Sequence, residues 1–304
     1  MTEIFYLTKR NCMVYLRDKS AVFFSLLSML IVLGLMVIFL GAMNSRSLVQ
    51  ILAEYGGERD TALDEKNAAY VIQLWTLAGI LVVNAVTVTL TVLGAMVQDE
   101  TRKRILGFYV TPVKRIKLVF GYVLASWIVG TIMCLLTLAA GEVYFLIRGY
   151  EVLSVSVNLK LLLMIMLNTF VFSSLGYLLA LFVHSESGWS GMLTVVGTLV
   201  GFVGGIYIPM AALSEKLQTV LKALPVLHGA AMMRQVCTEH AVKEIFEGLP
   251  AGIADVFNEE MGITLFWGED MIDIKQQVIF LLVYAIVAIG IAAVINKKRR
   301  LRDR

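Results

Sequence analysis

Six long stretches of the sequence contain no Asp, Glu, Lys or Arg, and they constrain the fold more than any other feature. The shortest has 18 residues, close to the roughly 20 that a helix needs to cross a bilayer. Only 16% of all residues are charged, against about a quarter in soluble domains. A soluble helical core is disfavoured because its helices carry a polar stripe, which these stretches lack. The sequence therefore predicts an all-α integral membrane protein, a single transmembrane domain over residues 1–304 with six transmembrane helices at 21–43, 71–97, 118–141, 161–183, 188–213 and 278–295.

Positive charge is divided unequally between the two sets of connecting segments. Segments on the side of the N-terminus contain 16 Lys and Arg and 6 Asp and Glu, whereas the opposite side contains 10 and 17. The positive-inside rule therefore predicts a multi-pass protein with both termini in the cytoplasm, and we expect the plasma membrane of a bacterial cell. The basic cluster Lys297–Arg304 follows a span directly. We interpret it as a topology anchor that contacts membrane lipids, and we expect no nucleic-acid partner.

Residues 1–19 have the pattern of an amphipathic helix. On a helical wheel one arc is apolar, and it comprises Ile4, Leu7, Cys12, Val14 and Tyr15. Lys9, Arg10 and Arg17 lie opposite. A basic amphipathic helix of this kind is suited to the cytoplasmic membrane interface. A disordered leader is disfavoured by the apolar content.

Segment 98–117 is the main loop expected on the cytoplasmic side. It opens with Asp99 and Glu100, which we place at a helix N-terminus, where the helix dipole favours acids. Basic residues follow, then the apolar Leu106 and Phe108, and Pro112 ends the helix because the residue before a proline avoids the α conformation. Apolar side chains exposed beneath a membrane indicate a binding partner. A helix lying on the membrane surface is the alternative interpretation.

The opposite side carries the acidic segment 44–70 and the longer segment 214–277. The latter begins with apolar residues at helical spacing and then mixes apolar residues with glycine and proline. We expect a helical external loop between spans five and six that folds back onto the outer membrane surface.

The sequence contains no motif for catalysis or for nucleotide binding. No Gly-Lys dipeptide occurs, so the chain lacks a phosphate-binding P-loop. Its three cysteines and three histidines form no metal-binding pattern. We expect neither catalytic residues nor a metal or cofactor in this chain, and ATP-driven work would need a partner. The membrane spans also lack the ionisable groups that proton-coupled carriers use.

Uncharged polar residues and glycines mark two of the predicted spans. One face of span two carries Asn and Thr, and one face of span five carries Thr. Span five also has two overlapping G-x-x-x-G spacings, which allow close helix approach. The residues are Asn84, Thr87, Thr91, Thr194, Thr198, Gly197, Gly201 and Gly205. We interpret them as a transport pathway or a dimer interface. Ordinary helix packing is the alternative.

Three places in the sequence resemble the type-2 ABC transporter permease family. The first runs from Glu100 through the basic residues to Thr111-Pro112 and then Gly121. The second is Gly204-Gly205-Ile206-Tyr207-Ile208-Pro209, at the end of the fifth run. The third is Leu224-Pro225-Val226-Leu227-His228 continuing to Arg234. Their order and spacing extend over the whole chain.

The resemblance implies the membrane subunit of an ABC exporter, a non-catalytic permease that moves an amphiphilic drug, lipid or peptide out of the cell. ATP and Mg²⁺ would bind two copies of a separate ATPase subunit, and a second permease would complete a homodimer or a pair of paralogues. Residues 99–110 of the coupling loop 98–117 would form the coupling helix. The expected ATPase-coupling residues are Glu100, Arg104, Leu106, Phe108 and Pro112. A membrane sensor, accessory subunit or immunity protein is the alternative function.

Overall fold

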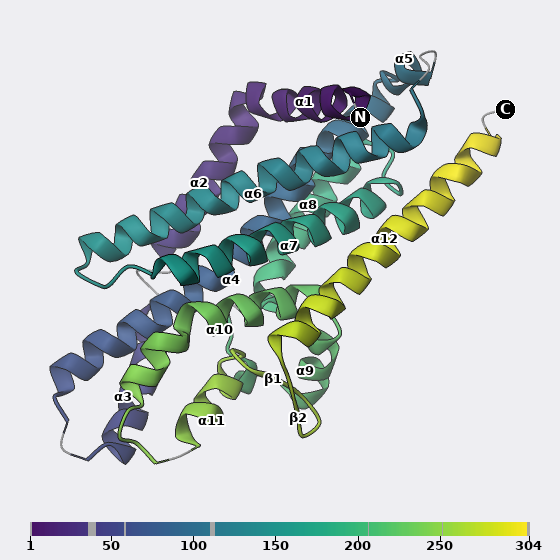
Figure 1. Ribbon diagram of the computed structural model, residues 1–304. Helices are drawn as coiled ribbons and strands as arrows, with labels where there is room; N and C mark the ends of the chain where they lie inside the picture. Colours follow the sequence, from purple (N-terminus) through teal and green to yellow (C-terminus); the bar gives the residue numbers. More distant parts are fainter. Residues whose placement is uncertain are drawn as a thin grey trace.

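The computed structural model describes residues 2–35, 41–57, 59–109, 113–205, 207–250 and 252–302. These residues form helices almost throughout, with one short hairpin (Figure 1). In chain order the elements are α1 Thr2–Arg17, α2 Lys19–Leu35, α3 Gly41–Tyr55, α4 Thr61–Thr101, α5 Ile105–Tyr109, α6 Arg115–Ile147, α7 Val155–Ala180, α8 Glu186–Val203, the 3-10 turn η2 Met210–Ala212, α9 Glu215–Lys222, α10 Pro225–Ile245, α11 Ile253–Glu260, β1 Leu265–Trp267, β2 Asp270–Ile272 and α12 Ile274–Arg302.

Helix α4 is the centre of the bundle. It has 41 residues, about 60 Å of helix, which is twice the thickness of the hydrocarbon core of a bilayer. It packs against α6, α7, α8 and α10, and its central residues, such as Trp75, Ile80 and Leu81, are fully buried. A helix surrounded in this way is apolar on all sides, so it shows no polar stripe in the sequence.

Four described helices are long and apolar enough to cross a membrane, namely α4, α6, α7 and α12. They contain the predicted spans two, three and six, and most of span four, since α7 ends three residues before the predicted end at 183. Helix α2 covers the first part of the predicted span 21–43, and residues 36–40 lie outside the described residues. The total of six spans therefore stays a prediction.

The prediction for span five is wrong beyond residue 203. The uncharged run 188–213 is not one helix, because α8 ends at Val203. Gly205 then adopts a left-handed conformation with φ of 62°, which glycine tolerates because it has no Cβ. After Pro209 the chain forms the short η2 turn.

Segment 214–277 does not simply cover the outer surface as expected. Pro225 stands at the first position of α10, where its missing N–H costs nothing. Helix α10 then enters the bundle, where it packs against α4, α7 and α12. Met232 and Met233 in its middle are fully buried. Short α9, α11 and the antiparallel β1–β2 hairpin accompany it.

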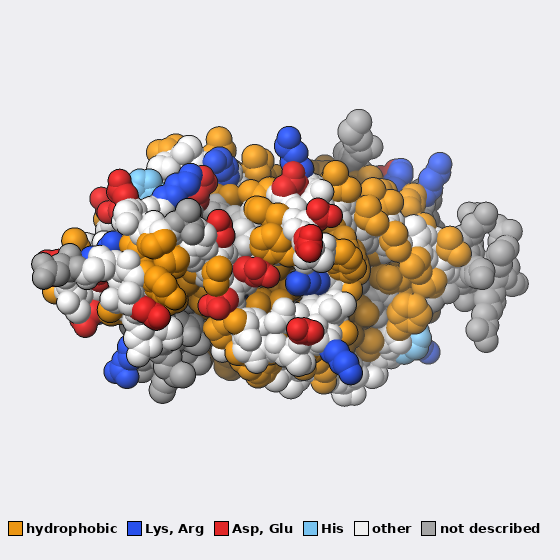
Figure 2. Space-filling model, turned by 90° about the horizontal axis from the view of Figure 1, so that it is seen from below, with side chains coloured by type: hydrophobic (Ala, Val, Ile, Leu, Met, Phe, Trp, Pro, Cys, Tyr) orange, Lys and Arg blue, Asp and Glu red, His pale blue; other side chains and the backbone are white. Residues whose placement is uncertain are grey.

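The bundle has two distinct ends (Figure 1). Helices α1 and α5 and the last turns of α12 lie together at one end, called here the α5 end. Helices α3, α9 and α11 and the hairpin lie at the other, called the α11 end. The view from below, onto the α11 end, shows many acidic side chains among hydrophobic ones (Figure 2). This distribution matches the excess of Asp and Glu on the side that the sequence predicts to be external.

Candidate coupling surface and helix-packing core

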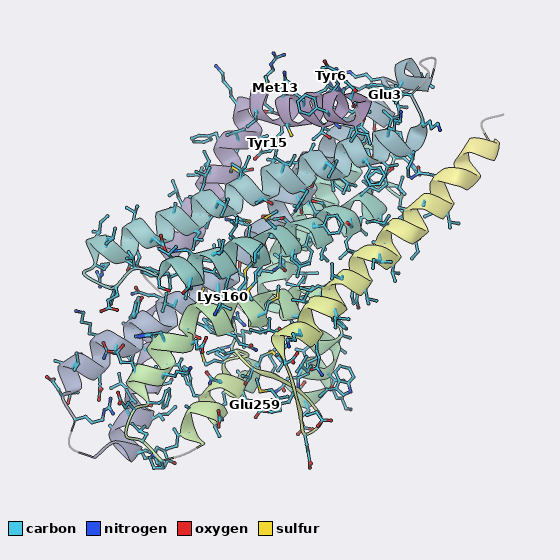
Figure 3. All side chains as sticks on the ribbon, in the orientation of Figure 1. Glu3, Tyr6, Met13, Tyr15, Lys160 and Glu259 are labelled. Carbon is cyan, nitrogen blue, oxygen red and sulfur yellow. The ribbon has the colours of Figure 1, made fainter. Side chains whose placement is uncertain are left out.

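Helix α1 is held against the bundle by a close approach to α6. A Cβ atom at Gly121 would lie 2.7 Å from the Cβ of Leu7, so only glycine fits beneath that leucine. Tyr15 is also buried, and its hydroxyl group donates a hydrogen bond to Ser25. Tyr6 and Met13 lie on the opposite, exposed side of α1 (Figure 3). Residues 2–17 thus form a helix, but its apolar arc packs on protein, and its place at the membrane interface stays a prediction.

Asp99 is the centre of a polar network at the α5 end. Its carboxylate accepts hydrogen bonds from both terminal nitrogens of Arg10, one of them (Nη2) at 2.9 Å, and from the Tyr122 hydroxyl at 2.7 Å. The Asp99 side chain is 3% exposed. The hydrogen bond from Arg10 to Asp99 raises the pKa of the Arg10 guanidinium above its ordinary value, although burial of Arg10 lowers it. The network joins α1, α4 and α6.

The expectation of acids at a helix N-terminus is wrong. Helix α4 continues through Thr101, so Asp99 and Glu100 lie in its last turn, where the helix dipole disfavours negative charge. Arg10 compensates for this in the case of Asp99. The helical wheel places Arg10 opposite the apolar arc of α1, yet its side chain reaches Asp99 of α4. Arg10 follows Leu7 by three residues and precedes Val14 by four, a spacing that places it at the edge of the apolar arc.

Helix α5, only five residues long, projects from this network. The turn from α4 includes Lys103 in a left-handed conformation with φ of 57°. The ring of Phe108 lies 5.4 Å from the Arg10 guanidinium, a cation–π contact. Leu106 is 53% exposed. Pro112, which was predicted to end the coupling helix, lies outside the described residues.

The turn between α4 and α5 is also tied to α8. Arg102 Nε lies 2.9 Å from a carboxylate oxygen of Glu186, in the first turn of α8. Arg104 stays half-exposed, with one nitrogen 3.9 Å from Asp99. Of the predicted coupling residues, the structure therefore brings Arg104 and Phe108 together around Arg10 and Asp99. Glu100 belongs to α4 and Leu106 points to the surface.

Small polar residues join the central helices. The Asn84 side-chain amide donates to Thr137 of α6 at 2.7 Å, and further hydroxyl pairs link α6 to α7, namely Ser126 with Ser173 and Thr131 with Thr169. The predicted polar face of span two is split. Asn84 is directed to α6, whereas Thr87 lies beside Gly197 of α8, where an added Cβ would be 3.9 Å from the Thr87 methyl group. Thr91 bonds within its own helix.

The glycines of span five do not form one continuous stripe. Gly197 faces Thr87, a Cβ at Gly201 would clash with the ring of Tyr207, and Gly205 lies in the turn after α8. Each of the three glycines therefore has a neighbour within this chain, and their assignment to a transport pathway or a dimer interface stays a prediction. Thr194 and Thr198, in contrast, are exposed. With Val195 and Leu199, they form the α8 face, which no described residue of this chain covers.

No three His, Cys, Asp or Glu side chains converge as metal ligands within the part of the chain that the structure describes. Apolar helices of membrane-spanning length around a buried central helix define a multi-pass helical membrane protein. The family model described as "ABC-2 family transporter protein" matches residues 47–294. The chain therefore belongs to the ABC-2 transporter family, whose members are permease subunits associated with an ABC ATPase subunit. No curated protein sequence shows significant similarity to the chain.

The family match confirms the resemblance found in the sequence. The matched region begins at residue 47, in α3. Helices α1 and α2 lie before the matched region, so the role of α1 rests on its own contacts with α4 and α6. Residues 99–109, including the Asp99 network and α5, lie within the match.

Proposed function

We propose that the chain is the permease subunit of an ATP-driven exporter and that its ATPase docks on α5. The observation that carries this proposal is the geometry at the α5 end. Leu106 is exposed on a short helix, while Phe108 of the same helix contacts Arg10. An apolar side chain exposed beside an ordered charge network is suited to a protein partner.

The contacts around α5 offer two routes by which a docked ATPase could move the membrane helices. One runs from Phe108 through Arg10 to Asp99, and thus to α1 and α4. The other runs from Arg102 to Glu186, at the start of α8. Each route includes an ion pair that joins two helices, Arg10 with Asp99 in the first and Arg102 with Glu186 in the second. A displacement of α5 would therefore shift α4 and α8 relative to the rest of the bundle.

The exposed face of α8 supports pairing with a second permease, either identical or related. Val195 and Leu199 are 57% and 52% exposed, and Thr194 and Thr198 lie beside them. In this proposal, two permeases meet near α8, two ATPase subunits bind ATP and Mg²⁺, and an amphiphilic drug, lipid or peptide leaves the cell between the permeases. Both termini and the α5 end lie in the cytoplasm of a bacterial cell.

The docking site is tested with a charge at the exposed apolar position. We expect Leu106→Glu to abolish co-purification with the ATPase subunit and stimulation of its ATP hydrolysis, because a carboxylate would have to be buried in the interface. Val256→Glu is the matched control, since Val256 is a similarly exposed apolar residue (57%) on α11 at the opposite end. If the complex and its ATPase activity survive Leu106→Glu, α5 is not the docking helix. If the wild-type chain binds no ATPase at all, the sensor or accessory function stands instead. Transport assays in vesicles with drugs, lipids and peptides test the substrate class.

A further inference from the structure

An arginine lies fully buried where α10 meets the end of α8. Arg234 has 0% exposure. Its Nη2 donates hydrogen bonds to the carbonyl oxygens of Gly204 and Gly205, each at 2.9 Å, and its Nη1 lies 3.5 Å from the carbonyl oxygen of Gly262. The guanidinium lies over the ring of Trp75 of α4, 4.2 Å from the ring centre. One side chain therefore connects α4, α8, α10 and the loop after α11.

The charge on Arg234 is stabilised without an acidic partner. No ion pair joins it to an Asp or Glu among the residues that the structure describes. Burial of an isolated cation is costly. Here the carbonyl groups at the C-terminal end of α8 carry the negative end of its helix dipole, and the Trp75 ring adds a cation–π contact. The position of this cation thus depends on the end of α8 remaining in place.

Arg234 also makes a connection that its neighbours do not make. Trp75 donates to the Met261 carbonyl at 2.8 Å, and Gln235 donates to the Ile263 carbonyl at 2.8 Å. Both bonds fix the loop after α11. Within the described chain, every side-chain hydrogen bond from α10 to the end of α8 comes from Arg234. Loss of this side chain would remove these hydrogen bonds between α10 and the end of α8, while the loop stayed attached through Trp75 and Gln235.

We infer that Arg234 is a positioning residue that holds the end of α8 against α10 and so keeps the α11 end of the bundle closed. Opening this end requires the guanidinium to leave the carbonyls of Gly204 and Gly205. The closed state is held by these hydrogen bonds and by the cation–π contact with Trp75, all of which must break before this end opens. The inference deepens the proposed function, since in a transporter the ATPase supplies the energy for this opening.

A native cysteine reports on this movement. Cys237 lies on α10, three residues after Arg234, is 3% exposed and forms no disulfide. It lines a cavity of about 490 Å³ between the start of α4, the loop from α6 to α7 and the second half of α10. Lys160, labelled in Figure 3, and Tyr70 line the same cavity. A shift of α10 would therefore bring the thiol into contact with solvent in the cavity.

The test measures how fast a hydrophilic maleimide labels Cys237 in the permease–ATPase complex in lipid nanodiscs. Cys12 is replaced by Ser, and Cys134 stays buried in the bundle. A hydrogen bond to a charged group contributes more than one between neutral groups, and labelling through local opening follows the open population. We expect Arg234→Gln to raise the resting labelling rate about tenfold or more. Arg234→Lys should give an intermediate rate, because an ammonium group cannot hold both carbonyls in the fork geometry of Arg.

Control variants distinguish a specific effect of the Arg234 contact with α8, called here the Arg234 clamp, from a general destabilisation of α10. Gln235→Met removes the hydrogen bond to Ile263 and leaves the contact of Arg234 with the end of α8. We therefore expect its rate of Cys237 labelling to stay within about threefold of the wild-type rate. Cys237→Ser should abolish labelling. Equal rates for wild type and Arg234→Gln would overturn the inference, as would an equal increase with Gln235→Met. If Arg234→Gln does not fold, Arg234→Lys decides by the same comparison.

ATP hydrolysis gives a separate readout. We expect ATP hydrolysis to accelerate labelling of Cys237 in the wild-type complex. The acceleration should be smaller in the Arg234→Gln variant, because the end of α8 has already lost its hydrogen bonds to α10. If Arg234→Gln labels fast at rest but ATP never changes the wild-type rate, the clamp stands and the proposed function fails.

Discussion

Removal of the Arg10 side chain tests whether α1 is a connected part of the coupling surface. Asp99 is 3% exposed and Arg10 is 33% exposed. Removal of one partner from a fully buried ion pair costs about 3–5 kcal/mol. The cost is smaller here because Arg10 is partly solvated, and because Tyr122 and Arg104 stay near the carboxylate. For Arg10→Met we expect a loss of about 2 kcal/mol in the free energy that holds α1 to the bundle.

Hydrogen exchange of the α1 amides measures this free energy directly. Exchange from a docked helix follows the population of its open state, and about 2 kcal/mol corresponds to a roughly 30-fold faster exchange. Glu3→Gln is the matched control, because it breaks another ion pair of α1, the one with Lys117 of α6. That pair, Glu3 with Lys117, has a separation of 2.7 Å but side chains that are 46% and 27% exposed. Exposed pairs contribute little to stability because solvent screens them, so we expect at most about a fivefold change.

Two results would refute this reasoning. One is equal exchange rates in Arg10→Met and Glu3→Gln, which would mean that burial of Asp99 does not strengthen its ion pair. The other concerns a double-mutant cycle of Arg10→Met with Asp99→Asn. Residues in direct contact should show a coupling energy of about 0.5–3 kcal/mol, so strictly additive effects would contradict the contact.

Two further predictions concern α6 and α10. Gly121→Ala should lower the melting temperature and loosen α1, since its Cβ would lie 2.7 Å from Leu7 and overpacking costs about 1–3 kcal/mol. The control Gly290→Ala should change the melting temperature little, because its Cβ would meet no atom within 4 Å. A similar loss in both variants would contradict the steric argument. Burial lowers the pKa of His228, although its hydrogen bond to the Lys222 carbonyl opposes this. The unfolded chain therefore binds the proton first, and stability should fall as the pH drops below about 6.5 towards the lowered folded-state pKa. His228→Gln should flatten the dependence of melting temperature on pH between 7.5 and 5.5, and an unchanged slope would show that another group is responsible.

The helices of the membrane core were predictable from the sequence because the signal is local. Runs such as 71–97 and 118–141 lack charge over the length of a bilayer, and each lies within one helix, α4 or α6. The motifs that resemble ABC transporter permeases were likewise readable in order, and the family match confirms them. The end of α8 was not predictable from hydrophobicity, since the uncharged run continues past Gly205, where backbone conformation ends the helix.

The candidate site depended more on the tertiary structure. In the sequence, Arg10 is one of four basic residues before the first uncharged run, and Asp99 follows 89 positions later, so nothing local pairs them. Arg234 likewise stands in a polar stretch that reads as an external loop, yet it is fully buried. The sequence by itself determined which segments avoid water, because transfer into a membrane depends on each segment's own side chains. Only the tertiary structure decided which charges are buried and paired, because a buried charge is stable only beside partners that distant segments supply.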